Sequence, residues 1–215
     1  MSIDIASYLG TVTRVVETRE RDGKPAKVVI ASRTYDTSVE DLWNAITTPD
    51  RLVRWFMPIT GELKLGGRYQ LEGNAGGSIT ACEPPHHLAA TWEFGGGVSW
   101  IDVTLSKRAS GAHLVLEHMA HVDPHWEKFG PGAVGVGWDL TLYGLHLHVT
   151  TGFDKGQGFD EMAFFGSPEG KQLVRSANDG WGQAAIAAGE DRTLALESAA
   201  RTFAFYTGGP PPEAP

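Results

Sequence analysis

Two early runs of the chain alternate polar residues with valine, isoleucine and threonine, as β-strands do. They are residues 11–18 (TVTRVVET) and 27–35 (KVVIASRTY). Between them, Asp22-Gly23 is a strong signal for a tight hairpin turn. The pattern therefore predicts a two-stranded antiparallel hairpin.

The spacing of the apolar residues then changes from that of a strand to that of a helix. One stripe with i, i+3, i+4 and i+7 spacing consists of Val39, Leu42, Trp43 and Ile46. Thr37 or Ser38 precedes the stripe as an N-cap. Pro49 ends this helix and starts a second one that reaches Phe56. Two short helices are predicted here.

The central part of the chain returns to strand-like alternation, broken by glycine, proline and asparagine. The predicted strands are residues 59–65, 67–73, 77–83, 88–94, 98–106 and 112–120. Strands this short, joined by turns this tight, indicate an antiparallel meander.

After a predicted loop at 121–132, the longest helical pattern covers residues 133–150 and carries a broad apolar face. We expect this face to lie against the sheet. Two more helices are predicted at 167–189 and 191–206. The organisation predicted is a domain over 1–152, a helical extension over 153–207 packed on or beside it, and a disordered tail over 208–215.

Composition narrows the function classes. The 215 residues are 41% hydrophobic, enough for a substantial core, and carry a net charge of −8. A surface that follows nucleic-acid phosphates needs an excess of Lys and Arg, so no nucleic-acid partner is expected. The single cysteine, Cys82, excludes a disulfide framework, and we interpret it as a buried, inert thiol. No cofactor and no metal are predicted.

Neither a signal peptide nor a membrane span is predicted. Residues 1–5 lack a basic segment followed by an apolar one. The most apolar stretch, 133–149, is interrupted by Asp139, His146 and His148 and falls short of the ~20 residues that a membrane helix needs. We expect a cytoplasmic protein that does not bind membranes.

Several motifs together resemble the START-like (SRPBCC) superfamily, in the group related to the C-terminal domain of the Hsp90 ATPase activator. They are SVEDLWNAITTPDRLVRWFMP at 38–58, LGGRY at 65–69, PHHLAATW at 85–92 and GW at 137–138. The resemblance covers residues 11–150 and implies an α+β helix-grip fold, in which a curved antiparallel sheet surrounds a long C-terminal helix. Members bind or transform many different ligands, so the resemblance specifies fold more than activity.

A strongly bent sheet cannot close tightly on one straight helix, so such a fold is expected to hold a cavity. On strand 112–120 we expect the face with Leu114, Leu116 and His118 to point inward, because it completes an apolar row. The predicted ligand-binding residues are Trp55, Phe56, Trp92, Trp100, Leu116, His118, Trp138, Leu142 and Leu145. Aromatic rows also fill cores, so core packing is the alternative for each.

Two further patterns have simpler explanations. The run GPGAVG at 130–135 matches G-x-G-x-x-G, but the strand that a dinucleotide-binding fold places before it is missing. We interpret these glycines as small residues that let the helix start pack closely against the sheet. His118, His121 and His125 form a local group, but a strand places His118 and His121 on opposite faces, so a shared metal would require the loop to fold back. Solvated histidines in the loop after the strand are the simpler interpretation than a metal site.

Three functions remain open. The first is a non-catalytic carrier or sensor that binds a small hydrophobic or aromatic ligand. The second is a small enzyme, such as a polyketide cyclase or a hydrolase, with His118 as general base beside Glu93 or Glu117. The third is a chaperone partner like the Hsp90 activator, which the net charge of −8 disfavours. Whether the chain is an enzyme and whether it forms a homodimer are left open.

Overall fold

The computed structural model describes residue 8 and residues 10–209, and the chain divides into two compact units. The first contains Met1–Ala31, His121–Leu140 and Asp160–Pro215, and the second contains Ser32–Ala120 and Thr141–Phe159. Strand β2 (Lys24–Tyr35) and helix α5 (Gly132–Thr151) each begin in the first unit and end in the second. The predicted tail lies, from residue 210 on, outside the described residues.

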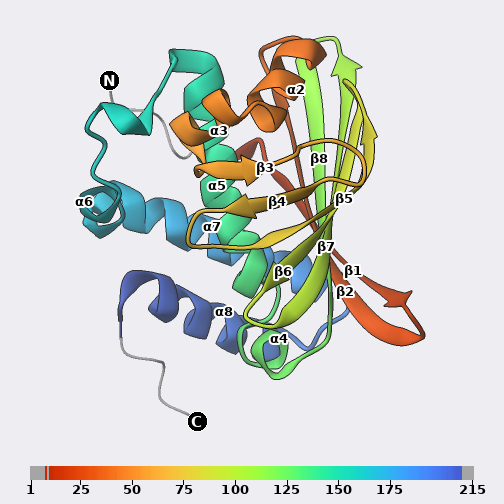
Figure 1. Ribbon diagram of the computed structural model, residues 1–215. Coiled ribbons are helices and arrows are strands. Elements are labelled where there is room, and N and C mark those ends of the chain that lie inside the picture. Colours follow the sequence, from red (N-terminus) through yellow and green to blue (C-terminus); the bar gives the residue numbers. More distant parts are fainter. Residues whose placement is uncertain (1–7, 9, 210–215) are drawn as a thin grey trace. The chain divides into compact units, whose positions relative to one another are not determined.

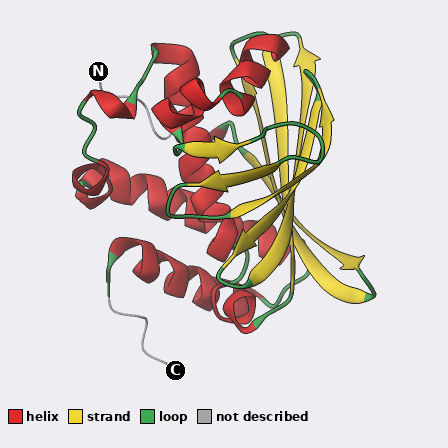
Figure 2. Cartoon of the chain, viewed as in Figure 1, coloured by secondary structure: helices red, strands yellow, loops and turns green. Residues whose placement is uncertain are grey.

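The strands form one curved antiparallel sheet. Besides β2, the strands are β1 (Thr13–Arg21), β3 (Ile59–Gly61), β4 (Arg68–Leu71), β5 (Gly76–Glu83), β6 (His87–Phe94), β7 (Gly97–Arg108) and β8 (Gly111–His121). Their order is β1-β2-β8-β7-β6-β5-β4-β3, as Figure 1 shows, and each pair from β3 to β8 is antiparallel. Figure 2 shows the strands of this sheet in yellow and the helices in red. The predicted meander and the α+β helix-grip class are confirmed.

The first hairpin turns at Asp22 and Gly23, where both residues have positive φ angles of 53° and 71°. Two consecutive positive φ values are what a two-residue hairpin turn of type I′ requires, and Asp-Gly adopts them at low cost. The predicted hairpin signal is therefore confirmed by the backbone.

Strand β8 follows the alternation that its sequence predicts. Ala112, Leu114, Leu116 and His118 are buried, whereas the residues between them are only half-buried. The face that carries Leu116 and His118 is therefore the inner one, as predicted. We call it the inner face of the sheet, and the opposite one the outer face.

Helices α2 (Val39–Thr47) and α3 (Pro49–Trp55) follow β2 in the second unit. The Ser38 hydroxyl accepts a hydrogen bond from the backbone N–H of Asp41 and so caps α2. Pro49 stands at the start of α3, where the missing N–H costs nothing. Both predicted helices are confirmed, and α2 packs against the sheet at β7.

The first unit is mainly helical. Its helices are α4 (Pro124–Phe129), α6 (Glu161–Gly166), α7 (Pro168–Ala187), α8 (Arg192–Thr207) and the first part of α5, while the 3₁₀ turn η1 (Lys155–Gln157) belongs to the second unit. The prediction of a loop over 121–132 was wrong, because α4 forms inside it. Asp123 accepts from the backbone N–H of Trp126 and Pro124 follows it, so the capping signal was present in the sequence.

The glycines of the G-x-G-x-x-G run sit where helices approach closely. A Cβ atom on Gly135 would lie 2.3 Å from the Trp181 ring of α7, and one on Gly132 would lie 3.0 Å from Thr202 of α8. Close packing was predicted correctly, but its partner was not: these glycines contact α7 and α8 rather than the sheet. Trp181 is fully buried as a result.

A buried ion pair forms the polar centre of the first unit. Arg14 of β1 donates to both carboxylate oxygens of Asp139, at 2.8 and 3.0 Å, and the Trp181 indole donates to the same carboxylate at 2.7 Å. Asp139 is completely buried on α5. Burial raises the pKa of Asp139, and these donors oppose that change. The trio connects β1, α5 and α7.

Candidate ligand-binding site

The inner face of the second unit can be read from the strand register, because directly paired residues of antiparallel strands point to the same side. Ile101 of β7 pairs with Ala90 of β6 and with His118 of β8, and Ser99 pairs with Trp92. The inner face therefore brings together Trp92, Ser99 and His118, which come from three neighbouring strands.

These three residues form a small polar group beside an aromatic ring. The centroids of the Trp92 and His118 rings are 5.8 Å apart. His118 Nε2 lies 2.8 Å from Ser99 Oγ, and the Ser99 hydroxyl donates to the Trp92 carbonyl oxygen at 3.2 Å. A hydroxyl has one proton, and Ser99 donates it to the Trp92 carbonyl oxygen. Ser99 Oγ therefore accepts a hydrogen bond from His118 Nε2. His118 thus carries its proton on Nε2.

Burial fixes the charge of this imidazole. His118 has only 6% of its surface exposed, and burial lowers its pKa to about 4. The side chain is therefore neutral at pH 7 and acts there as a hydrogen-bond donor through Nε2.

An apolar cluster adjoins the group. Its buried centre consists of Tyr69, Leu71, Ile79 and Ala90, and the partly buried residues packed against it are Phe56, Met57, Ile59, Leu63, Cys82, Leu88, Trp92 and Ile101. Tyr69 donates its hydroxyl proton to the Thr91 carbonyl oxygen at 2.7 Å, and burial raises the pKa of Tyr69 to about 12. The cluster joins the loop after α3 to β3, β4, β5, β6 and β7.

Helix α3 brings Trp55 and Phe56 to this region. Their rings stack with centroids 5.6 Å apart. The Trp55 indole donates to the Ala45 carbonyl oxygen at 3.1 Å, so its polar atom is already satisfied by α2. Trp55 is therefore held in the core, whereas Phe56 is only partly buried.

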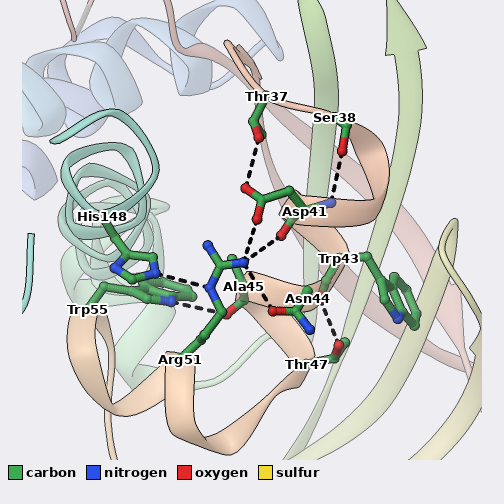
Figure 3. A network of polar contacts seen from close by, with 10 residues as sticks. All are labelled: Thr37, Ser38, Asp41, Trp43, Asn44, Ala45, Thr47, Arg51, Trp55 and His148. Atoms are coloured by element: carbon green, nitrogen blue, oxygen red, sulfur yellow. Dashed lines mark hydrogen bonds and ion pairs between the residues drawn. The ribbon is translucent and has the colours of Figure 1, made fainter. Parts of the chain in front are cut away.

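Arg51 joins α3 to α2 and to the end of α5, as Figure 3 shows. Its Nη1 donates to Asp41 Oδ1 at 2.6 Å and to Asn44 Oδ1 at 3.1 Å, and its Nε donates to His148 Nε2 at 3.2 Å. The hydrogen bond from Arg51 lowers the pKa of Asp41. Because His148 accepts at Nε2, its proton stands on Nδ1, which donates to the Phe153 carbonyl oxygen at 2.8 Å.

The segment after α5 is attached to the same helix. Lys155 Nζ donates to the carbonyl oxygen of Phe56, and η1 packs against α3. Together with the Arg51 network, this contact fixes the position of Phe56 beside the apolar cluster.

A family model for activator of Hsp90 ATPase homolog 1-like proteins matches residues 36–150. The chain belongs to this family. A comparison with curated protein sequences gave no significant match.

Solved structures resemble the chain over a longer range. CalU16 from Micromonospora echinospora is 28% identical, with a TM-score of 0.66 to its crystal structure over 81% of this chain and 98% of CalU16. Its solution structure gives a TM-score of 0.69 over 84% of this chain and 98% of CalU16. Protein MLL2253 from Mesorhizobium loti is 23% identical, with a TM-score of 0.50 over 55% of this chain and 93% of MLL2253, which shows the fold alone.

The predicted site residues of this family member fall into three groups. Trp92, Leu116 and His118 lie on the inner face, and Phe56 joins them through the apolar cluster. A second group, consisting of Trp55, Leu142 and Leu145, is buried. Tyr35 donates its hydroxyl proton to the Leu142 carbonyl oxygen at 3.3 Å, which attaches the second part of α5 to the sheet. The third group consists of Trp100 and Trp138.

Trp100 does not share a face with His118. It pairs with Thr91 and Met119, one position along each strand from the inner-face residues, and so points outward. Its assignment to the same lining as His118 was therefore wrong. Trp138 is buried in the part of α5 that belongs to the first unit.

The predicted carboxylate partners of His118 are also on the outer face. Glu117 pairs with Asp102, and Glu93 pairs with Val98 and binds Arg68 at 2.8 Å. The sequence led us to expect Glu93 or Glu117 near His118, whereas the pleat turns both carboxylates to the opposite face. Ser99 was not predicted, although the alternation of β7 could have identified it.

Within residue 8 and residues 10–209, no group of three or more His, Cys, Asp or Glu side chains could hold a metal ion. No helix in the same residues has both the length and the apolar character to cross a membrane.

Proposed function

We propose that this protein binds a small hydrophobic or aromatic ligand on the inner face of the second unit, as a non-catalytic carrier or sensor. The observation that carries the proposal is the His118–Ser99 pair, in which a buried His118 and a half-buried Ser99 lie beside the Trp92 ring within an otherwise apolar surface. Ligand sites are typically apolar, with a few fixed polar groups.

The partial burial of the surrounding side chains supports the same proposal. Phe56, Leu88, Trp92 and Ile101 pack on the apolar cluster and yet retain accessible surface. Covering apolar surface of this kind stabilises a complex by about 25 cal/mol for each Å² removed from water.

The state of His118 favours binding over catalysis. A general base works best when its pKa lies near the working pH, whereas burial lowers the pKa of His118 to about 4. Its Nε2 proton also points at Ser99, so the imidazole is not arranged to take the proton of that hydroxyl. The pair instead offers fixed polarity in an apolar wall.

Matched tryptophan variants test the binding site. A neutral fluorescent probe, 1-pyrenebutanol, should bind the wild-type protein saturably, and Trp92→Ala should weaken binding by at least about tenfold. Trp100→Ala is the control, because Trp100 points to the outer face. Absence of saturable binding, or equal effects of the two variants, would refute the proposed site.

A small enzyme is the second candidate, and the 2.8 Å contact between His118 and Ser99 is the observation in its favour. Mass spectrometry of the ligand that copurifies with the protein separates the two functions. A carrier should return that ligand chemically unchanged after incubation. Conversion by the wild-type protein that is lost in both His118→Ala and Ser99→Ala would replace the carrier proposal with catalysis. The third function, a role of this protein as a chaperone partner, stays a prediction from the sequence.

A further inference from the structure

The hydrogen bonds around Ser99 run in one direction, which the Trp92 carbonyl oxygen determines. A carbonyl oxygen can only accept, so the Ser99 hydroxyl donates its proton in the 3.2 Å contact to Trp92. His118 Nε2, which lies 2.8 Å from Ser99 Oγ, must then donate to that oxygen. A charged imidazolium would donate in the same way, so the direction holds in either charge state of His118.

One acceptor position of Ser99 is left over. A hydroxyl oxygen donates one hydrogen bond and can accept two. In the part of the chain that the structure describes, Ser99 Oγ makes two hydrogen bonds, to Trp92 and to His118, and only the second occupies a lone pair. The side chain is half-buried, so a second donor can approach it. An O–H or N–H group of a ligand satisfies the remaining lone pair, whereas an ether or carbonyl oxygen does not.

An exposed aromatic side chain continues the inner face beyond Trp92. Phe94 stands two positions further along β6, so it points to the same side, with its Cα roughly 7 Å away. It is 61% exposed. Gly97, its partner on β7, adds no side chain to cover the ring, and a Cβ placed there would meet nothing closer than the Phe94 carbonyl oxygen at 3.5 Å. The ring is therefore open to a ligand that lies on this face.

The two aromatic rings and the acceptor are close enough for one ligand to reach all three. Ser99 pairs directly with Trp92, and the side chains of such a pair lie about 5 Å apart on one face. A flat system of fused rings can therefore cover Trp92 and Phe94 while its edge reaches Ser99. Aromatic rings gain from contact with one another beyond the area that they bury, and a rigid ring system loses little internal freedom on binding. Both effects favour an aromatic ligand over an aliphatic chain.

We infer that the ligand is a planar aromatic alcohol, such as a phenol with fused rings, whose ring system covers Trp92 and Phe94 and whose hydroxyl donates to Ser99 Oγ. This inference rests on the proposed ligand-binding function and names the ligand class. It also gives two residues separate tasks. Phe94 selects the aromatic body, and Ser99 selects a hydroxyl over an ether or a carbonyl oxygen, because the proton of Ser99 is held by the Trp92 carbonyl oxygen.

Two probes that differ only in their donor test the inference. 1-Hydroxypyrene and 1-methoxypyrene share the ring system, but only the first can donate a hydrogen bond. The wild-type protein should bind 1-hydroxypyrene about threefold to tenfold more tightly, the range expected for one net hydrogen bond. Titration of the pyrene fluorescence at pH 7 measures both dissociation constants.

Serine variants locate this preference. Ser99→Ala should remove it, because the variant deletes the acceptor and changes little else. Ser106→Ala is the matched control: Ser106 lies on the same strand and is also half-buried, but it is an odd number of positions from Ser99 and so points to the outer face. In that variant the preference should be unchanged.

A second pair of variants tests the position of the ring system. Phe94→Ala should weaken the binding of both probes by about threefold to tenfold and leave their ratio unchanged, because it removes only an aromatic contact. Val98→Ala is the control, since Val98 is also an exposed apolar residue but pairs with Glu93 on the outer face. Its affinities should equal those of the wild-type protein.

A measurement on the wild-type protein covers the case in which Ser99→Ala does not fold. The ¹⁵N chemical shifts of the His118 ring should place the proton of the neutral imidazole on Nε2. A proton on Nδ1, equal affinities for the two pyrenes, a preference that survives in Ser99→Ala, or unchanged affinities in Phe94→Ala would overturn the inference and leave the proposed function intact. Binding of 1-pyrenebutanol without either of the two probes would do the same. Failure of all three molecules to bind would contradict the proposed function itself.

Discussion

Single residues of the inner face show how burial sets the chemistry that a side chain can perform. His118 differs from a solvated histidine only in its surroundings, yet burial lowers its pKa to about 4 and leaves it neutral at pH 7. Ser99 then orients the one remaining ring proton. A residue that resembles a general base in the sequence therefore becomes a fixed hydrogen-bond donor in the fold.

The same burial makes stability depend on pH. The folded state resists protonation of His118, whereas the unfolded chain takes up that proton near pH 6.5. The stability that the neutral state contributes is thus present above pH 6.5 and is lost as the pH falls towards 4, by an amount on the order of 3 kcal/mol. His118→Gln should reduce the fall in unfolding free energy between pH 7 and pH 4, measured by urea denaturation. If the free energy of unfolding fell equally in the two proteins between pH 7 and pH 4, the lowered pKa of His118 would be contradicted.

At the scale of elements, helix α3 is held by a few polar contacts at one end of the second unit. Arg51 connects it to Asp41 and Asn44 on α2 and to His148 on α5. Trp55 is the last residue of this helix and Phe56 follows it directly, so the position of both depends on Arg51. The network in Figure 3 is thus part of the support of the proposed site.

Arg51→Ala should lower the free energy of unfolding by about 1–3 kcal/mol, because Asp41, Asn44 and His148 lose a shared donor. It should also speed the release of a bound probe, since α3 is less firmly held. Arg54→Ala, an exposed position in the last turn of α3, is the control and should change stability by less than about 0.5 kcal/mol. Urea denaturation and stopped-flow release measure the two effects; equal values for both variants would count against the network.

Helix packing in the first unit depends on a missing side chain. A methyl group on Gly135 would lie 2.3–2.6 Å from three atoms of the buried Trp181 ring, so Gly135→Ala should cost about 1–3 kcal/mol despite the better helix propensity of alanine. Gly166→Ala, at the end of α6 with no atom within 4 Å of the added carbon, should be close to neutral. Thermal denaturation compares the two, and a stable Gly135→Ala protein would show that Trp181 can move aside.

At the scale of the whole molecule, the first unit is assembled from segments far apart in the sequence. The two ends of the Arg14–Asp139 pair are 125 positions apart, and Trp181 is 42 positions beyond Asp139. Because these contacts need all three segments in place, the C-terminal helices contribute directly to the core of this unit.

Asp139→Asn should lower the free energy of unfolding by about 3–5 kcal/mol, because it leaves the Arg14 guanidinium buried without its countercharge. Adding Arg14→Met to this variant should restore part of the loss. Glu62→Gln, which removes an exposed pair with Lys64, serves as the comparison and should cost less than about 1 kcal/mol. A double variant no more stable than Asp139→Asn alone would mean that the pair does not act as a unit.

The sequence alone determined the features that depend on neighbouring residues. Period-two alternation and the Asp22-Gly23 pair specified the strands and the first turn, and capping residues specified helices such as α2. The inward direction of Leu116 and His118 followed from the same alternation. These signals are local because backbone hydrogen bonding and side-chain direction repeat every few residues.

Only the tertiary structure decided which distant residues meet. Register placed Ser99 beside His118 and turned Trp100, Glu93 and Glu117 to the other face. Long-range packing gave the glycines at 130–135 their partners in α7 and α8. A shift of one residue in register reverses the direction of a side chain, and no pattern within a single strand fixes its register against the next. The fold could therefore be predicted from motifs, whereas the composition of the candidate site required the paired strands.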